Sequence, residues 1–243
     1  MATLDLATAY DETRRSVTAL VRDLDGASLA TPVPATPNWS VRDAVAHLTG
    51  VAQDLVIGEG LEAYGAVLDR SSLPALDLRT SEQVGSRRAV PFDAVLEEWS
   101  SWAERLLPIL RGEGEPLAVP FADRMIVTDV ATHAQDVRGA LGRPGDRESL
   151  GVGVAFASYA GGLHLRLAGS GLPALRIAYG GKHRDLGDGE PAATVRAERF
   201  ELYRAMGGRR SRRQILAFDW TGEPEHYLPL IPAYGERADD LVE

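Results

Sequence analysis

Two histidines and one aspartate have the residue types and the spacing from which a metal site can be built. His47 lies in an amphipathic segment, and some eighty residues later Asp129 and His133 lie four positions apart. Residues four apart share one face of a helix. If the helix that carries His47 packs against that face, two imidazoles and one carboxylate meet. Such a set suits zinc, nickel, iron or manganese and leaves coordination positions open for water or substrate.

The sequence also limits the chemistry that the chain itself can supply. It contains no cysteine among its 243 residues and only five histidines. Disulfides, thiolate nucleophiles and zinc–thiolate sites are therefore excluded. Any thiol that reacts must come from a separate molecule, and any metal site must be built from histidine, aspartate and glutamate.

Charge and hydropathy exclude two classes of partner. The formal net charge is -9 and the pI is near 5.1, whereas binding to nucleic acid requires a basic surface that neutralises phosphates. No apolar run approaches the roughly 18 residues of a membrane-spanning helix. The N-terminus lacks the basic start and apolar run of a signal peptide. We therefore expect a cytoplasmic protein with neither a membrane nor a nucleic-acid partner.

Apolar residues recur with helical spacing in four segments of the first part of the chain. These segments cover residues 3–24, 40 to about 64, 91–110 and 123–141. Ser40 is a natural N-cap, and Asp43 three residues later completes a capping-box-like pair. Residues 70–89 are polar and show no clear period, so we interpret them as a loop that could contain a short helix. Together the four segments predict a four-helix bundle over residues 1–145.

The composition changes after Pro144, and residues 146–243 predict a small α+β domain, so the fold class is α plus α+β. Alternating apolar and polar residues predict strands over 174–179 and 192–197, with a further strand between them that follows a Gly-Gly turn and ends at Leu186. Helices are expected over three segments of this domain, which are residues 150–168, 198–206 and 212–218.

The sequences around the three candidate ligands resemble two motifs of a known family. Residues 38–50, Asn-Trp-Ser-Val-Arg-Asp-Ala-Val-Ala-His-Leu-Thr-Gly, are similar to the W-S/T-V-R-D-x-x-A-H-L-x-G motif of the mycothiol-dependent maleylpyruvate isomerase family, within the DinB-like superfamily. Residues 129–142 resemble its second motif, in which an acidic residue, three others and a histidine precede W-D-x-x-R-A-x-G. Two positions depart from the pattern: Asp129 replaces the glutamate of the characterised isomerases, and Gln135 replaces the usual tryptophan.

The resemblance implies a DinB-like four-helix bundle that binds a divalent metal through His47, Asp129 and His133. Zinc is the first expectation, with nickel, iron or manganese as alternatives. It also implies mycothiol, a low-molecular-weight thiol of actinobacteria, as cofactor and a small electrophile as substrate. An arginine of the C-terminal domain is expected to bind a substrate carboxylate in a bidentate contact. The candidates for this role are Arg209, Arg210 and Arg213.

Three functions agree with these observations. The first is a mycothiol-dependent isomerase or S-transferase, the second is a metal-dependent hydrolase that does not use mycothiol, and the third is a non-catalytic metalloprotein that binds a small molecule. The protein is expected to be a monomer or a homodimer.

Three local assignments also have alternatives. The arginines over residues 209–213 could instead be solvated surface charge. Asp136 could accept a hydrogen bond from His133 or lie in solvent beside a neighbouring arginine. Trp39 is interpreted as a hydrophobic contact that fixes the start of its helix.

Overall fold

The computed structural model describes residues 5–61, 63–64, 70–113, 117 and 121–243. The chain divides into two compact units, which are Met1–Ala155 together with Glu243, and Phe156–Val242. This division falls within helix α7 (Leu150–Ala168), whereas the sequence prediction places the domain boundary at residues 145 and 146. No helix in the described part of the chain is both long and apolar enough to cross a lipid bilayer.

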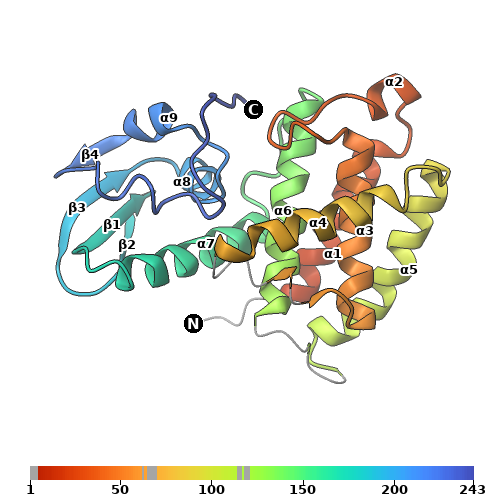
Figure 1. Cartoon of the computed structure of the whole chain (residues 1–243), viewed down its shortest axis with the longest axis horizontal. Coiled ribbons are helices and arrows are strands. Elements are labelled where there is room, and N and C mark those ends of the chain that lie inside the picture. The colour runs from red at the N-terminus through yellow and green to blue at the C-terminus, as the bar shows by residue number, and fades with distance from the viewer. Residues whose placement is uncertain (1–4, 62, 65–69, 114–116, 118–120) are drawn as a thin grey trace. The chain divides into compact units, whose positions relative to one another are not determined.

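The first unit is built around four helices, which Figure 1 shows as a bundle: α1 (Leu6–Val21), α3 (Val41–Ile57), α5 (Phe92–Leu110) and α6 (Ala122–Ala140). Helices α1 and α3 each pack against both α5 and α6. Their apolar faces meet in one core that contains the fully buried Trp99, whose indole N–H donates a 3.0 Å hydrogen bond to the Tyr10 hydroxyl. The predicted four-helix bundle is therefore confirmed.

The local sequence explains where α3 begins and ends. The Ser40 hydroxyl accepts from the backbone N–H of Asp43, and the Asp43 carboxylate accepts from the backbone N–H of Ser40, which is the predicted capping box. The helix ends at Ile57 because Gly58 adopts the left-handed conformation, with φ 78°. The prediction that this helix continues to about Tyr64 is therefore wrong.

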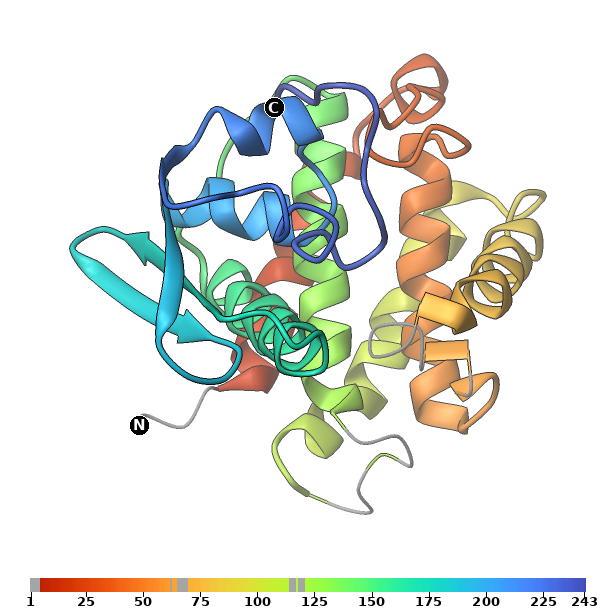
Figure 2. The same cartoon turned by 60° about the vertical axis from the view of Figure 1, so that its left-hand side comes forward.

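The segment that we interpreted as a loop with room for a short helix contains a helix of 13 residues, α4 (Leu73–Gly85), which follows a 3-10 turn at Arg70–Ser72. Helix α4 packs against α3 (Figure 2). Its buried residues are Gln83 and Val84, and so small a buried set leaves no apolar period in the sequence. The short helix α2 (Gly26–Leu29) was also not predicted.

The second unit is an α+β fold, as predicted. Its four-stranded sheet has the order β2-β1-β3-β4, with strands β1 (Ala174–Tyr179), β2 (Lys182–Leu186), β3 (Pro191–Arg196) and β4 (Asp219–Thr221). Strand β1 pairs antiparallel with β2 and parallel with β3, and β4 pairs antiparallel with β3. Gly180 and Gly181 join β1 to β2 with φ of 50° and 74°, as a two-residue hairpin turn requires. The three-residue strand β4 was not predicted from the sequence.

The part of α7 that follows Ala155, together with α8 (Arg199–Met206) and α9 (Arg212–Leu216), completes the second unit. Leu163 of α7, Ile177 of β1 and Met206 of α8 are buried and line the same small apolar cavity, so these three elements share one core. The helix predicted over residues 212–218 ends two residues earlier than expected.

Candidate metal centre

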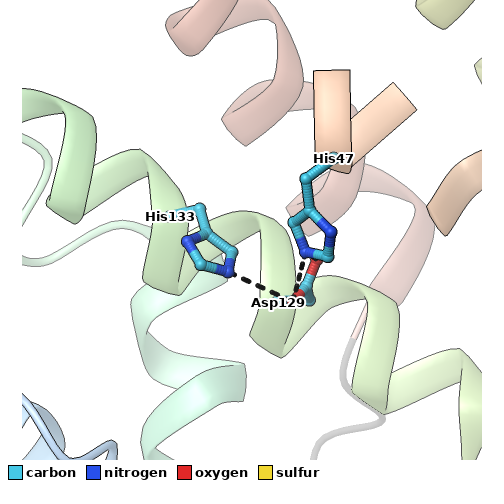
Figure 3. A group of neighbouring side chains, drawn as sticks. All are labelled: His47, Asp129 and His133. Carbon is cyan, nitrogen blue, oxygen red and sulfur yellow. Dashed lines mark hydrogen bonds and ion pairs between the residues drawn. The ribbon is translucent and has the colours of Figure 1, made fainter. Parts of the chain in front are cut away.

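His47, Asp129 and His133 lie together in the first unit, and Figure 3 shows their side chains pointing toward one another from α3 and α6. His47 Nε2 is 3.4 Å from Asp129 Oδ2, and His133 Nε2 is 3.6 Å from Asp129 Oδ1. One potential ligand atom of each residue lies within 4.8 Å of the other two. The structure thus brings together all three residues that the sequence selected.

Two of the distances within this cluster fit a metal ion. Two ligands about 2.0–2.1 Å from a tetrahedral ion are about 3.4 Å apart. The two separations between imidazole nitrogen and carboxylate oxygen, 3.4 Å and 3.6 Å, are close to that value. Both imidazoles are buried, and the Asp129 side chain is partly exposed. Two imidazoles and one carboxylate at this spacing can hold zinc or another first-row divalent metal.

Asp136 lies at the second nitrogen of the His133 ring. Its Oδ2 is 3.0 Å from His133 Nδ1, and its side chain is fully buried. A carboxylate at Nδ1 favours a proton on that nitrogen and leaves Nε2 with its lone pair toward Asp129. The alternative in which Asp136 lies in solvent is therefore wrong, because its side chain is buried. The carboxylate lies at ion-pair distance from His133 Nδ1, and a hydrogen bond between the two side chains stays a prediction.

His47 also has a polar neighbour at its second nitrogen, and this neighbour was not predicted from the sequence. Gln83 of α4 places its Oε1 2.8 Å from His47 Nδ1. Both side chains are buried. Little in the sequence indicates that Gln83 lies near His47, because Gln83 belongs to the polar segment that was interpreted as a loop with room for a short helix.

The indole ring of Trp39 lies beside both imidazoles. Its ring centroid is 4.7 Å from that of His47 and 5.4 Å from that of His133. The apolar surroundings of a metal site control how water reaches it. The contact that we expected of Trp39 at the helix start stays a prediction, and its ring also lies beside both candidate imidazole ligands.

The three candidate arginines lie in the second unit and have different environments. Arg209 and Arg210 are buried, so their interpretation as solvated charge is wrong. Arg210 makes two hydrogen bonds to the Glu201 carboxylate, at 2.6 Å and 3.0 Å. The Arg213 side chain is 83% exposed and pairs with Asp240. A role for any of the three toward a substrate stays a prediction.

Gln135, which stands where the second motif has a tryptophan, lines a cavity of about 170 Å³ in the first unit. Its Nε2 donates to the carbonyl of Gly145 at 3.1 Å. Glu12 and Asp146 are among the polar residues around this space, and none of the three candidate ligands is among its described lining residues. Gln135 is smaller than the tryptophan of the motif, and open space lies beside it on α6.

Gly50, one turn after His47, lets α4 approach α3 closely. A Cβ at this position would lie 2.5 Å from Gln83 Cγ and 2.6 Å from Gln83 Cβ. Because these atoms are close to the α4 backbone, the helix itself would have to move. We expect Gly50→Ala to lower the free energy of unfolding by about 1–3 kcal/mol, although alanine is the better helix former. Urea unfolding measures this change.

Gly85→Ala is the matched control, because an added Cβ at the end of α4 would meet nothing within 4 Å. This variant should be neutral or slightly more stable than the parent. Equal stabilities of Gly50→Ala and Gly85→Ala would contradict the close approach of α4 to α3.

Comparison with known proteins agrees with this fold. A family model described as the mycothiol maleylpyruvate isomerase N-terminal domain matches residues 10–138, which is more than half of the chain. Two crystal structures, of the mycothiol-dependent maleylpyruvate isomerase and of a histidine-to-alanine mutant of it, each match with a TM-score of 0.59 at 13% identity. Each match covers 92% of this chain and 97% of the other. No curated protein matches the sequence.

Proposed function

Because the chain belongs to the mycothiol maleylpyruvate isomerase family, we propose that it is a metal-dependent enzyme that uses mycothiol to act on a small electrophile. The observation that carries this proposal is the convergence of His47, Asp129 and His133 at metal-ligand spacing. Bound there, a divalent metal and the thiol of mycothiol would supply a thiolate nucleophile for reversible addition to an activated double bond or for displacement of a leaving group. The protein contains no cysteine that could supply this thiolate itself.

In this proposal the residues of the first unit hold the metal and shape its surroundings. His47 and His133 bind through Nε2, and Asp129 binds through its carboxylate. Asp136 orients the His133 ring, and Trp39 excludes water from one side of the two imidazoles. Zinc is the proposed metal, with nickel, iron or manganese as alternatives, and the cytoplasm is the proposed location because low-molecular-weight thiols stay reduced there.

The buried arginines of the second unit are proposed to bind a carboxylate of the electrophile. Arg210 is held by its contacts with Glu201, and Arg209 donates from Nη1 to the carbonyl of Gly207 at 2.7 Å. Side chains fixed in this way lose little conformational freedom when they bind an anion. Arg213 is the weaker candidate because its side chain is exposed.

Calorimetric titration with mycothiol tests the proposed thiol. We expect binding to the metal-loaded protein and at least about 10-fold weaker binding to the metal-free protein, because the metal stabilises the thiolate. Titrations in two buffers with different ionisation enthalpies should show the release of about one proton, since a thiol must be deprotonated to bind a metal.

S-methyl mycothiol is the matched control ligand, because it keeps the sugar groups and cannot form a thiolate. It should bind weakly and release no proton. If mycothiol does not bind the metal-loaded protein, or if the S-methyl form binds equally well, the thiol role is wrong. The choice would then lie between a thiol-independent hydrolase and a non-catalytic metalloprotein.

A further inference from the structure

Two polar stripes face each other where α4 packs on α3. On α3, His47, Gly50 and Asp54 follow one another at intervals of three and four residues, so they share one helix face. On α4, Arg79 and Gln83 are four apart and share the facing side. Gly50 has no side chain to separate the two helices, and an added Cβ there would collide with Gln83. The stripes therefore meet directly.

Asp54 is the centre of this contact. Its carboxylate is almost fully buried and accepts from Arg79 Nε at 2.8 Å and from Arg79 Nη2 at 2.5 Å. It also accepts from the Tyr64 hydroxyl at 2.8 Å. Burial and the nearby Asp54 carboxylate raise the pKa of Tyr64, so this hydroxyl stays protonated and donates. A charged acceptor with these donors is fixed in place.

The contact with Asp54 determines which way the Gln83 amide points. Gln83 Nε2 donates to Asp54 Oδ2 at 2.7 Å and lies 2.8 Å from the Tyr64 oxygen. The reversed amide would place its carbonyl oxygen against the Asp54 carboxylate, and its N–H groups would lose the Asp54 and Tyr64 oxygens as acceptors. The Gln83 oxygen is therefore the atom that faces His47 Nδ1, at 2.8 Å.

We propose that Gln83 is a positioning residue that holds neutral His47 in the Nδ1–H tautomer, with Asp54, Tyr64 and Arg79 fixing the direction of its amide. An amide oxygen only accepts, so the proton between Gln83 and His47 belongs to Nδ1. Nε2 then carries the lone pair that a metal requires. The consequence for metal affinity rests on the proposed function, whereas the tautomer does not.

Without Gln83, the other neighbour of the ring favours the opposite tautomer. Asp129 lies 3.4 Å from His47 Nε2 and can accept a proton placed there. A proton on Nε2 blocks the lone pair and must be displaced before a metal binds. Gln83 thus acts on the metal site through His47 and does not contact the metal itself.

Nitrogen-15 NMR of the metal-free protein at about pH 9, well above the ordinary histidine pKa, reads the tautomer of neutral His47 directly. The His47 signals are assigned by their loss in His47→Ala. We expect the Nδ1–H tautomer in the parent protein and mainly the Nε2–H tautomer in Gln83→Met, which keeps the side-chain length but removes the amide. Zinc affinity, measured by competition with a chelator, should fall about 10- to 100-fold in Gln83→Met.

Gln53→Met is the matched control, because Gln53 also lies at this side of α3 but accepts from Arg87 Nη2 at 2.6 Å. It should keep both the His47 tautomer and the zinc affinity of the parent. Gly50→Ala is a second route, which moves Gln83 without changing its chemistry and should shift the tautomer in the same direction.

The Nε2–H tautomer in the parent protein would overturn the positioning role, and so would an unchanged tautomer in Gln83→Met. A different result would contradict the proposed function. A parent protein that shows the Nδ1–H tautomer but binds no zinc would contradict the metal site and leave the role of Gln83 toward His47 supported.

Discussion

Replacing His133 with alanine is expected to abolish stoichiometric metal binding. The parent protein should carry about one divalent metal per chain, and its affinity in His133→Ala should fall by more than the 10- to 100-fold typical of a residue that only supports a ligand. The reason is that His133 supplies one of the three candidate ligand atoms, and Asp129 and His47 alone leave too few protein ligands to hold the ion. Metal analysis of the purified proteins and chelator competition measure both quantities.

The control for this variant is His183→Ala, because His183 is an exposed residue of β2 in the second unit. It should keep the full metal content. Circular dichroism establishes that His133→Ala is folded, since the lost imidazole also packs beside Trp39. A folded His133→Ala protein with full metal content would show that the cluster is not the metal site.

The candidate ligands could be found from the sequence because they lie on long helices with clear local signals. Asp129 and His133 need only the helical period to share a face. The capping box at Ser40 and Asp43 sets the register of the next helix and thereby the face on which His47 lies. Periodicity does not say which helices face each other, and the resemblance of the two flanking motifs supplied that information.

Gln83 could not be found in the same way. Helix α4 buries only two residues, and its contact with α3 depends on polar groups around Asp54 rather than on an apolar stripe. Hydrophobic periodicity is the main signal of a helix in a sequence, and it is absent when a helix is held by polar contacts. The end of α3 differs, because Gly58 is itself a sequence signal for a helix that ends in the left-handed conformation.

The burial of Arg209 and Arg210 was also beyond the reach of the sequence. Charged residues are rarely buried unless they are paired. The partner of Arg210 is Glu201, which lies on α8 and reaches it only because the chain turns back after that helix. A run of arginines next to a capping residue looks the same in sequence whether it is solvated or buried.

Arg79→Ala is expected to destabilise the first unit strongly. The Asp54 side chain is 1% exposed, and in the described part of the chain Arg79 is the cation that contacts it. Among the described residues, removing the guanidinium leaves this buried carboxylate with neutral donors only, and breaking a buried pair in this way costs about 3 kcal/mol or more. A loss of that size lowers the thermal midpoint of a chain this long by about 6–12 °C. Calorimetry or thermal circular dichroism measures the shift.

The comparison variant is Arg15→Ala, which removes an ion pair at the surface. Arg15 is 72% exposed and lies 2.8 Å from Asp11. A pair of this kind contributes at most about 1 kcal/mol. The thermal midpoint of Arg15→Ala should therefore stay close to that of the parent, which separates the effect of burial from the loss of an arginine.

A second substitution tells whether the unpaired charge causes the loss. Asp54→Asn in the Arg79→Ala background removes the charge and keeps a side-chain oxygen that can accept from Tyr64, so part of the lost stability should return. If Asp54→Asn restores nothing, or if Arg79→Ala alone costs less than about 1 kcal/mol, charge pairing does not hold α4 to α3. The direction of the Gln83 amide would then have to be set by packing against Gly50, and the tautomer of His47 should survive the loss of Arg79.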